Sequence, residues 1–518
     1  MLKIEGSYTE QKSTCQDNLK IWLTDGENFT QVVNSLVKQN YRLASLFGTD
    51  DRKTSKTFGV HSIMSSNSQD EWIKVSASLP EENPSYPALT NTIMAAIWYE
   101  KYLMDMFGIT AENHPDPRRL VHHENIPLHT HPLRKDFAWN TKLKKENHPH
   151  PMMHVEGNGI FEIPVGPIHA GIIEPGHFRF NVAGERIITL EGKLFFTHKG
   201  AEKLLEGKTI EQALPFIERL SDDSAASNAL AFVQAVESIC KTKISDRATL
   251  LRTLVVELER ITMHIHDLAN IAGMGTGYTI MAAQGFRIKE NLVRLSEDIF
   301  GNRFWRGFII PGGVNRNLDQ FELKQILLKT TEVVSEIKDL LQIGLSSDGL
   351  LERMVSTGLL SKEAALAYGA TGIPARATDL KIDTRIDHPY AAYSKLNLSV
   401  VTKTGGDVFA RYMIRVGEVN TSFQLIKDLI HMLEMLEGPT KHEVKVQTGE
   451  AISAVEGWRG EILHFVRLDE HGKIDRLFPR DPSFCHWPLF GEIGPGNIVP
   501  DFPLCNKSLN LSYSGTDL

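Results

Sequence analysis

Residues 248–270, ATLLRTLVVELERITMHIHDLAN, constrain the fold more than any other segment of this chain. Their apolar residues recur about every three or four positions over several turns, which predicts one long helix buried among other helices. Glu257 and Arg260 lie three positions apart, so their side chains can meet on one face of that helix. The same periodicity predicts covering helices over 225–240, 278–300 and 318–343.

Residues 155–190 carry the second informative pattern. Apolar and polar residues alternate over 178–182, and a short turn then leads into another apolar run, which predicts a β-hairpin. His169, Glu174 and His177 come just before this hairpin, in a loop rich in Gly and Pro that can present imidazole and carboxylate groups from a rigid base. The pattern indicates a buried polar site. The alternative interpretation is a pair of hydrogen-bonded structural histidines.

The remaining patterns divide the chain into a compact α+β domain at 1–125, a polar Pro- and His-rich linker at 126–152, and a large helix-rich domain at 153–518 with a small hairpin or sheet region. The fold class is therefore predicted to be α+β. The elements predicted for the first domain are a helix over 28–46, strands over 57–63 and 72–79, and a helix over 87–107. The C-terminal tail, 496–518, is predicted to be extended and tucked against the body.

Bulk properties exclude several classes of protein. The net charge of −8 argues against a nucleic-acid binder. No apolar run approaches the roughly 20 residues of a membrane-spanning helix, and the N-terminus lacks the apolar core of a signal peptide, so a soluble or peripheral protein is expected. Four scattered cysteines without a Cys-x-x-Cys pair predict a reducing compartment, no iron–sulfur cluster of the chain's own and no dedicated metal site. No nucleotide-binding glycine pattern is followed by a Rossmann unit.

Short motifs in the same order along the chain resemble a known superfamily. The chain resembles the [NiFe]-hydrogenase-like large subunits of energy-converting hydrogenases and of respiratory complex I, and its first part resembles the small peripheral-arm subunit of complex I. In many relatives the two subunits are fused. The motifs that carry the resemblance are Gly166-Pro167-Ile168-His169, Glu174-Pro175-Gly176-His177, Thr197-His198-Lys199-Gly200, Glu257-Leu258-Glu259-Arg260, Asp383-Thr384-Arg385, Glu456-Gly457-Trp458-Arg459-Gly460-Glu461 and Asp481-Pro482-Ser483.

The resemblance also shows where this chain departs from a hydrogenase. Relatives with a nickel–iron centre hold it with two Cys-x-x-Cys pairs, whose soft thiolates suit the metal. At the four corresponding positions this chain has Ser221, Ser224, Ser483 and His486, and Cys485 lies out of register. Serine hydroxyls do not hold nickel, so no nickel is expected.

In complex I the corresponding cavity binds a quinone headgroup between a histidine and a tyrosine. The resemblance assigns the histidine to His177, with His169 as a second candidate, and places Asp222 at the tyrosine position. Glu174 matches a glutamate that binds magnesium in hydrogenases, although no metal ligand is predicted here. His177, His169, Asp222 and Glu174 are the predicted catalytic residues. The neighbouring aspartates, Asp222 and Asp223, must be protonated or paired, or the pocket must be open to water.

His264 matches a histidine that in complex I lies near the iron–sulfur cluster of the adjoining subunit. His264, Arg260 and His198 are therefore predicted to be cofactor-binding residues, because the last two stand in matching motifs. The cofactors implied by the resemblance are a quinone acceptor and an iron–sulfur cluster held by a partner subunit.

The resemblance implies a subunit of a membrane-associated oxidoreductase like complex I, hydrogenase-4 or formate hydrogenlyase. In such a complex, electrons pass from an iron–sulfur small subunit to a quinone, and separate membrane subunits translocate ions. The expected location is peripheral, on the cytoplasmic face of the inner membrane, within a hetero-oligomer. One alternative is a non-catalytic coupling or scaffold subunit, and another is a true nickel–iron hydrogenase, which the serines oppose.

Overall fold

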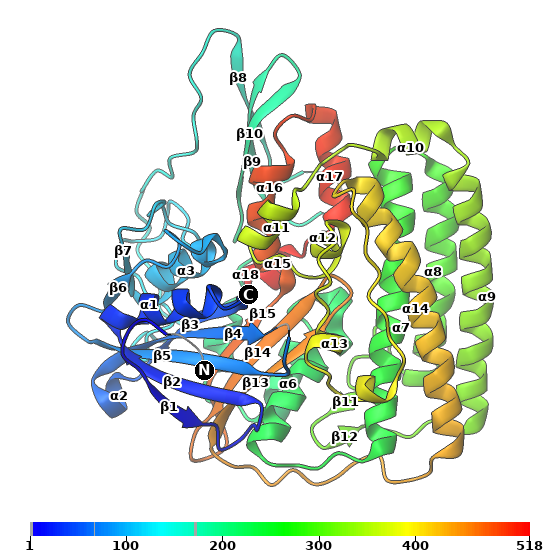
Figure 1. The fold of residues 1–518 in the computed structure, drawn as a ribbon, viewed down its shortest axis with the longest axis horizontal. Coiled ribbons are helices and arrows are strands. Elements are labelled where there is room, and N and C mark those ends of the chain that lie inside the picture. The colour runs from blue at the N-terminus through cyan, green and yellow to red at the C-terminus, as the bar shows by residue number, and fades with distance from the viewer. Residues whose placement is uncertain (1–3, 67, 170–172) are drawn as a thin grey trace.

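The computed structural model describes residues 4–66, 68–169 and 173–518. A β-sheet formed by the N-terminal residues lies on one side and a bundle of long helices on the other (Figure 1). A second sheet and a group of short C-terminal helices lie between them, and a hairpin projects from the body (Figure 1). The predicted α+β class is confirmed.

The N-terminal sheet has five strands in the order β1-β2-β5-β4-β3. The strands β2 and β5 run parallel, and the other neighbours are antiparallel. The two strands predicted over 57–63 and 72–79 are confirmed as β4 and β5. The strands are β1 (Thr9–Lys12), β2 (Leu19–Asp25), β3 (Tyr41–Asp50), β4 (Thr57–Ser66) and β5 (Trp72–Pro80).

The helix predicted over 28–46 is correct only in its first part. Helix α1 (Gly26–Val37) is capped by the Asp25 side chain, which accepts from the backbone N–H of Asn28. Asn40 then takes a left-handed conformation (φ 66°), which turns the chain into β3. The residues of β3 are almost all buried, so their continuous apolar run belongs to a covered strand and not to a helix face.

The helix predicted over 87–107 also starts later than expected, at α3 (Ile97–Phe107), after a short 3-10 turn. The reason is the buried side chain of Glu100. Its carboxylate accepts hydrogen bonds from the backbone N–H groups of Leu89 (2.7 Å) and Thr90 (3.0 Å). Those groups are therefore satisfied in a loop and need no helix.

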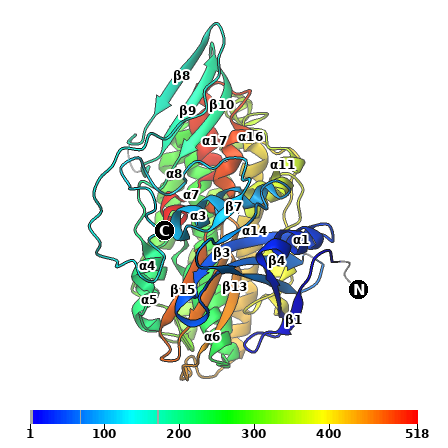
Figure 2. The same cartoon turned by 90° about the vertical axis from the view of Figure 1, so that its left-hand side faces the viewer.

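The predicted hairpin is confirmed and gains a third strand. Strands β9 (His177–Ala183) and β10 (Arg186–Lys193) pair in antiparallel fashion, and β8 (Ile160–Val165) joins the other edge of β9. Figure 2 shows this small sheet standing away from the body. Its base therefore places the loop before His177 against the C-terminal helices.

Four long helices form the bundle, and nearly every residue of α7 is buried within it. Helices α7, α8 and α9 confirm predicted helices, whereas α14 was not predicted. The charged residues Arg411, Arg415 and Glu418 of α14 lie inside the protein in ion pairs and hydrogen bonds, so its sequence lacks a clear apolar stripe. The helices are α7 (Asp246–Asn270), α8 (Thr279–Phe300), α9 (Gln320–Leu345) and α14 (Val408–Met435).

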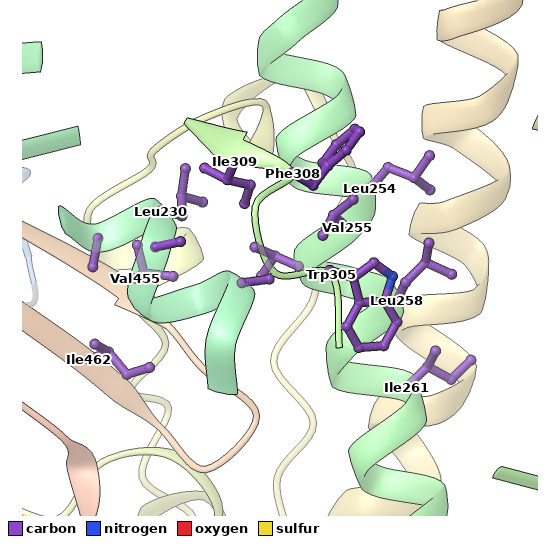
Figure 3. Packing of buried hydrophobic residues seen from close by; sticks show 14 of the residues in the cluster. Leu230, Leu254, Val255, Leu258, Ile261, Trp305, Phe308, Ile309, Val455 and Ile462 are labelled. Atoms are coloured by element: carbon purple, nitrogen blue, oxygen red, sulfur yellow. The ribbon is translucent and has the colours of Figure 1, made fainter. Parts of the chain in front are cut away.

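The second sheet connects the bundle to the N-terminal sheet. Figure 3 shows Leu230 of α6 between Val455 and Ile462 of this sheet and the side chains of α7. On the other face, the ring of Phe47 in β3 lies 4.4 Å from that of Phe465 and 5.4 Å from that of Phe478. The elements are α6 (Ala225–Ile239), β13 (Gly449–Glu456), β14 (Glu461–Leu468) and β15 (Ile474–Arg480).

The tail is tucked against the body, but the prediction that it is extended is wrong. Asn510 ends the helix before it in a left-handed conformation, and the Ser512 side chain caps the next helix by accepting from the N–H of Gly515. The prolines fall at helix starts, where a missing N–H costs little. The helices of the tail are α17 (Phe502–Leu509) and α18 (Tyr513–Asp517), and α15 (Pro482–His486) and α16 (Phe490–Ile493) precede it.

The division at 1–125, 126–152 and 153–518 stays a prediction. All of residues 113–159 are described, and no helix or strand lies among them. Within this stretch Lys135 reaches Glu206 (3.2 Å) and Asp475 (3.2 Å), so it is anchored to the large domain.

Candidate functional site

A cavity of about 370 Å³ lies where the hairpin loop, the end of α7 and the C-terminal helices meet. Its size is in the range of small-ligand sites, roughly 300–1,000 Å³. Most of its wall is polar, and segments far apart in the sequence contribute to it. The wall includes Glu174, Ser221, Asp222, Asp223, His266, Arg459, Asn506, Lys507, Asn510, Ser512, Tyr513 and Ser514.

Glu174 joins the hairpin loop to the last helix of the chain. Its Oε2 accepts a hydrogen bond from the backbone N–H of Ser514 (2.9 Å). The hydroxyl of Ser514 in turn donates to the carbonyl oxygen of Leu220 (2.9 Å), beside the turn that carries the aspartates. The three wall segments are thus tied together by hydrogen bonds.

The two adjacent aspartates have different environments. The side chain of Asp222 is 75% exposed and pairs with Arg306 (2.6 Å) at the surface. Asp223 makes a bidentate pair with Arg459, at 2.7 and 2.6 Å. Burial favours the neutral form of Asp223, but attraction to Arg459 outweighs it and holds the pKa of Asp223 below its ordinary value. Both carboxylates are therefore paired with an arginine, and Asp222 is the more exposed of the two.

Three serine hydroxyl groups lie at the back of the site. The Ser221 and Ser512 hydroxyl oxygens are 2.8 Å apart, and the Ser483 hydroxyl accepts from the N–H of Ser512 (2.9 Å). His486 is fully buried, its Nε2 accepts from the N–H of Thr371 (3.2 Å), and burial lowers its pKa to about 3. Within the described residues, no group of three or more His, Cys, Asp or Glu side chains is arranged to hold a metal ion.

Among the described residues that line the cavity, neither of the predicted histidines of the hairpin loop, His169 and His177, is present. His177 begins β9, with Nδ1 3.4 Å from the carbonyl oxygen of Gly166. The ring of His169 lies 6.3 Å from that of Phe178. Residues 170–172, which belong to the motif between them, are outside the described residues.

The three predicted cofactor-binding residues lie elsewhere. His264 is fully buried, its Nε2 lies 2.8 Å from Glu418, and burial lowers its pKa although Glu418 opposes the shift. Arg260 is buried between Glu257 (3.2 Å) and the carbonyl oxygen of Gly457 (3.0 Å), which confirms the predicted Glu257–Arg260 contact. His198 lines a separate cavity of about 310 Å³, and burial lowers its pKa.

Several wall residues were not predicted. The imidazole of His266 and the amine of Lys507 both line the cavity, and burial lowers the pKa of each. Arg459 belongs to one of the motifs that carry the resemblance, so the sequence contained a reason to consider it. Tyr513 had no such signal, because nothing in the tail sequence indicates which side chain packs against a distant loop.

The fold and the cavity define a class of protein: a small α+β part joined in one chain to a helix-bundle large subunit, with a polar site beside the hairpin loop. Residues 275–445 and 439–518 match the family described as respiratory-chain NADH dehydrogenase, 49 Kd subunit. Residues 23–143 match the 30 Kd subunit of the same enzyme.

Similar proteins cover most of the chain. It is 30% identical to formate hydrogenlyase subunit 5 of Escherichia coli, over 93% of this chain and 85% of that protein. It is 30% identical to hydrogenase-4 component G of Escherichia coli (92% and 83%) and to the C/D subunit of the NADH-quinone oxidoreductase of Bacteroides fragilis (76% and 77%). The chain belongs to the family of fused 30 Kd- and 49 Kd-type subunits of complex I-like and hydrogenase-4-like oxidoreductase complexes.

Across residues 4–66, 68–169 and 173–518, no helix combines the length and the apolar character that crossing a membrane requires.

Proposed function

We propose that this chain is the acceptor-site subunit of a membrane-associated oxidoreductase that lacks a nickel centre. Electrons arrive from a partner iron–sulfur subunit and reduce a quinone or a similar acceptor in the Glu174 cavity. Separate membrane subunits couple this reaction to ion translocation, and the chain sits peripherally on the cytoplasmic face of the membrane. The names of the relatives, which include a subunit of an NADH-quinone oxidoreductase, support this class.

One observation carries the proposal. The cavity wall combines Glu174 and Asp222, two of the predicted catalytic residues, with the hydroxyl of Ser221 at a former thiolate position. A wall of hydroxyl, carboxylate and cationic groups suits hydrogen bonds to a polar headgroup, whereas it lacks the soft ligands that nickel prefers. We propose that His177, whose Nδ1 lies 3.4 Å from the carbonyl oxygen of Gly166, helps to shape the hairpin loop, and that His169 does the same.

The test is quinone reduction by the purified intact complex, with Glu174→Gln as the variant. The amide keeps an oxygen that can accept from Ser514 but removes the charge, so the wall stays in place. We expect a loss of about tenfold in kcat/KM, roughly 1.4 kcal/mol. Glu162→Gln is the matched control, because Glu162 pairs with Arg179 on the projecting hairpin, away from the cavity. Equal rates in both variants would contradict the proposed site.

A non-catalytic coupling or scaffold subunit is the second candidate. This candidate is favoured by the ion pair between Asp223 and Arg459 in the cavity wall, because the two charges neutralise each other and need no ligand. A wild-type complex that assembles fully and reduces no quinone would establish this alternative. Nickel in stoichiometric amount would instead identify a hydrogenase.

A further inference from the structure

A second cavity, of about 520 Å³, lies between the N-terminal sheet and the large helical part of the chain. We propose that this cavity binds a small phosphate-bearing molecule, held by Lys241 and Lys243. The site is separate from the Glu174 cavity, because the two share no lining residue among the described residues. The inference therefore does not depend on the acceptor reaction.

The cavity is formed by segments from both parts of the chain. Gln16, in the loop between β1 and β2, accepts a hydrogen bond from the backbone N–H of Ile452 in β13 (3.3 Å), and both residues line the cavity. The connection between α6 and α7, residues 240–245, contributes Lys241, Thr242 and Lys243. The volume lies within the range of small-ligand sites, roughly 300–1,000 Å³.

The two lysines are cations without counter-ions. Both are exposed, and both line the cavity. Among the described residues, no carboxylate lies within 4.0 Å of either ammonium group. The neighbouring acidic side chains are already paired, Glu237 with Arg252 (2.6 Å) and Asp246 with Lys395 (2.7 Å). An anion would therefore meet two ammonium groups that are free to bind it.

The other ionisable groups of the lining leave its net charge positive. Arg252 and Glu237 neutralise each other through two hydrogen bonds, at 2.9 and 2.6 Å. Burial lowers the pKa of His388, although Asp70 opposes the shift, so this imidazole is neutral at physiological pH. The charge of the cavity therefore comes from the lysines, in a protein whose net charge is −8.

Neutral hydrogen-bond donors also line the cavity. Gln234 donates from Nε2 to the hydroxyl oxygen of Ser453 (3.0 Å), and no described residue accepts the proton of that hydroxyl. Thr242 contributes a second hydroxyl. Thr249, in the first turn of α7, lines the cavity too, so the partial positive charge at the start of that helix lies next to it. Ammonium and hydroxyl donors together suit phosphate oxygens, which accept several hydrogen bonds.

The rest of the wall includes apolar side chains. Ile452 and Ala454 belong to it, and so does Trp72, whose ring stacks on His388 with 4.0 Å between the centroids. The cavity is larger than a phosphate group needs, so an organic group would fit against these side chains. The shared chemistry of the ligand is the phosphate, which either a nucleoside phosphate or an inorganic polyphosphate supplies.

The test is isothermal titration calorimetry of the full-length chain at physiological salt, with inorganic pyrophosphate and ADP as probes. The variant combines Lys241→Gln and Lys243→Gln, which removes both charges but keeps polar side chains of similar length. The matched control combines Lys142→Gln and Lys144→Gln. These lysines are also exposed and two positions apart in a connecting segment, but they lie outside the cavity.

We expect pyrophosphate to bind the wild-type chain, and we expect the Lys241 and Lys243 variant to lose at least tenfold in affinity while the control loses none. Tighter binding of ADP than of pyrophosphate would assign a nucleoside phosphate as the ligand, and equal binding would assign an inorganic one. Failure of both probes to bind overturns the inference. The same loss of affinity in both lysine variants also overturns it, because overall charge would then explain the binding. Neither result alters the proposed function, which quinone reduction tests.

Discussion

Among single residues, the ion pair between Asp223 and Arg459 has the largest effect on the net charge of the cavity wall. Asp223 and Arg459 neutralise each other, and Asp222 is exposed enough for water to screen it. Two neighbouring aspartates therefore do not place two uncompensated charges inside the site. Glu174, whose Oε2 accepts from Ser514, is the remaining carboxylate whose charge faces the cavity.

Replacing Asp223 is expected to destabilise the chain. Asp223→Ala leaves the Arg459 guanidinium buried without its counter-ion, at a cost of about 3 kcal/mol in the free energy of unfolding. Asp222→Ala, the matched control at the next position, removes a surface pair worth less than about 1 kcal/mol. Urea unfolding of the full-length chain at neutral pH measures both. Equal effects would show that the charge of Arg459 does not depend on Asp223 for its compensation.

His464 makes stability depend on pH. Burial lowers its pKa to about 3, whereas the unfolded chain has an ordinary value of about 6.5. Between these values the unfolded state binds a proton that the folded state does not, so the stability falls as the pH falls from 6.5 toward 3.

His464→Gln should reduce this acid sensitivity, since glutamine keeps a side-chain N–H for Asn228 but does not titrate. The stability lost between pH 7 and pH 5 should shrink by roughly 2 kcal/mol relative to wild type. Denaturant midpoints at the two pH values measure the difference, and an identical loss in both proteins would contradict the assignment.

At the scale of elements, the contact between the hairpin loop and α18 depends on a glycine. A Cβ atom at position 176 would lie 2.6 Å from the Tyr513 ring and 3.1 Å from Leu194, so Gly176→Ala must displace the packed ring. We expect a loss of about 1–3 kcal/mol in stability together with slower quinone reduction.

Gly349→Ala is the matched control for this change. Gly349 is exposed in α10 (Asp348–Met354), and nothing lies within 4 Å of an added Cβ atom. Alanine there should stabilise the helix slightly, because it loses less entropy than glycine. If Gly176→Ala behaved like Gly349→Ala in thermal unfolding, the tight approach of α18 to the loop would be refuted.

Sequence patterns could predict the helices and strands whose buried faces are made of regularly spaced apolar residues. Helix α7 and the hairpin strands satisfy that condition. Helix α14 does not, because Arg411, Arg415 and Glu418 are buried through ion pairs and hydrogen bonds with distant residues. The tail was misjudged for a similar reason: Asn510 and Ser512 are polar, but they end and begin helices that pack against the body.

At the scale of the whole molecule, the cavity is assembled from the hairpin loop, the turn before α6, the end of α7, the loop after β13 and the last two helices. The resemblance could assign Glu174 and Asp222, because both stand in or beside matching motifs. It could not show that Tyr513 and Lys507 line the same cavity, since no local pattern encodes the proximity of segments so far apart in the sequence. It also marked His264 and Arg260, which make buried ion pairs with Glu418 and Glu257.

Locating the bound acceptor tests directly whether the Glu174 cavity is the acceptor site. The intact complex is photolabelled with an azido-quinone, and the labelled peptides are identified by mass spectrometry. We expect the label in peptides that contain Glu174, 221–223 or 507–514, and competition by unmodified quinone. Label confined to other parts of this chain, or to another subunit alone, would contradict the assignment of this cavity as the acceptor site.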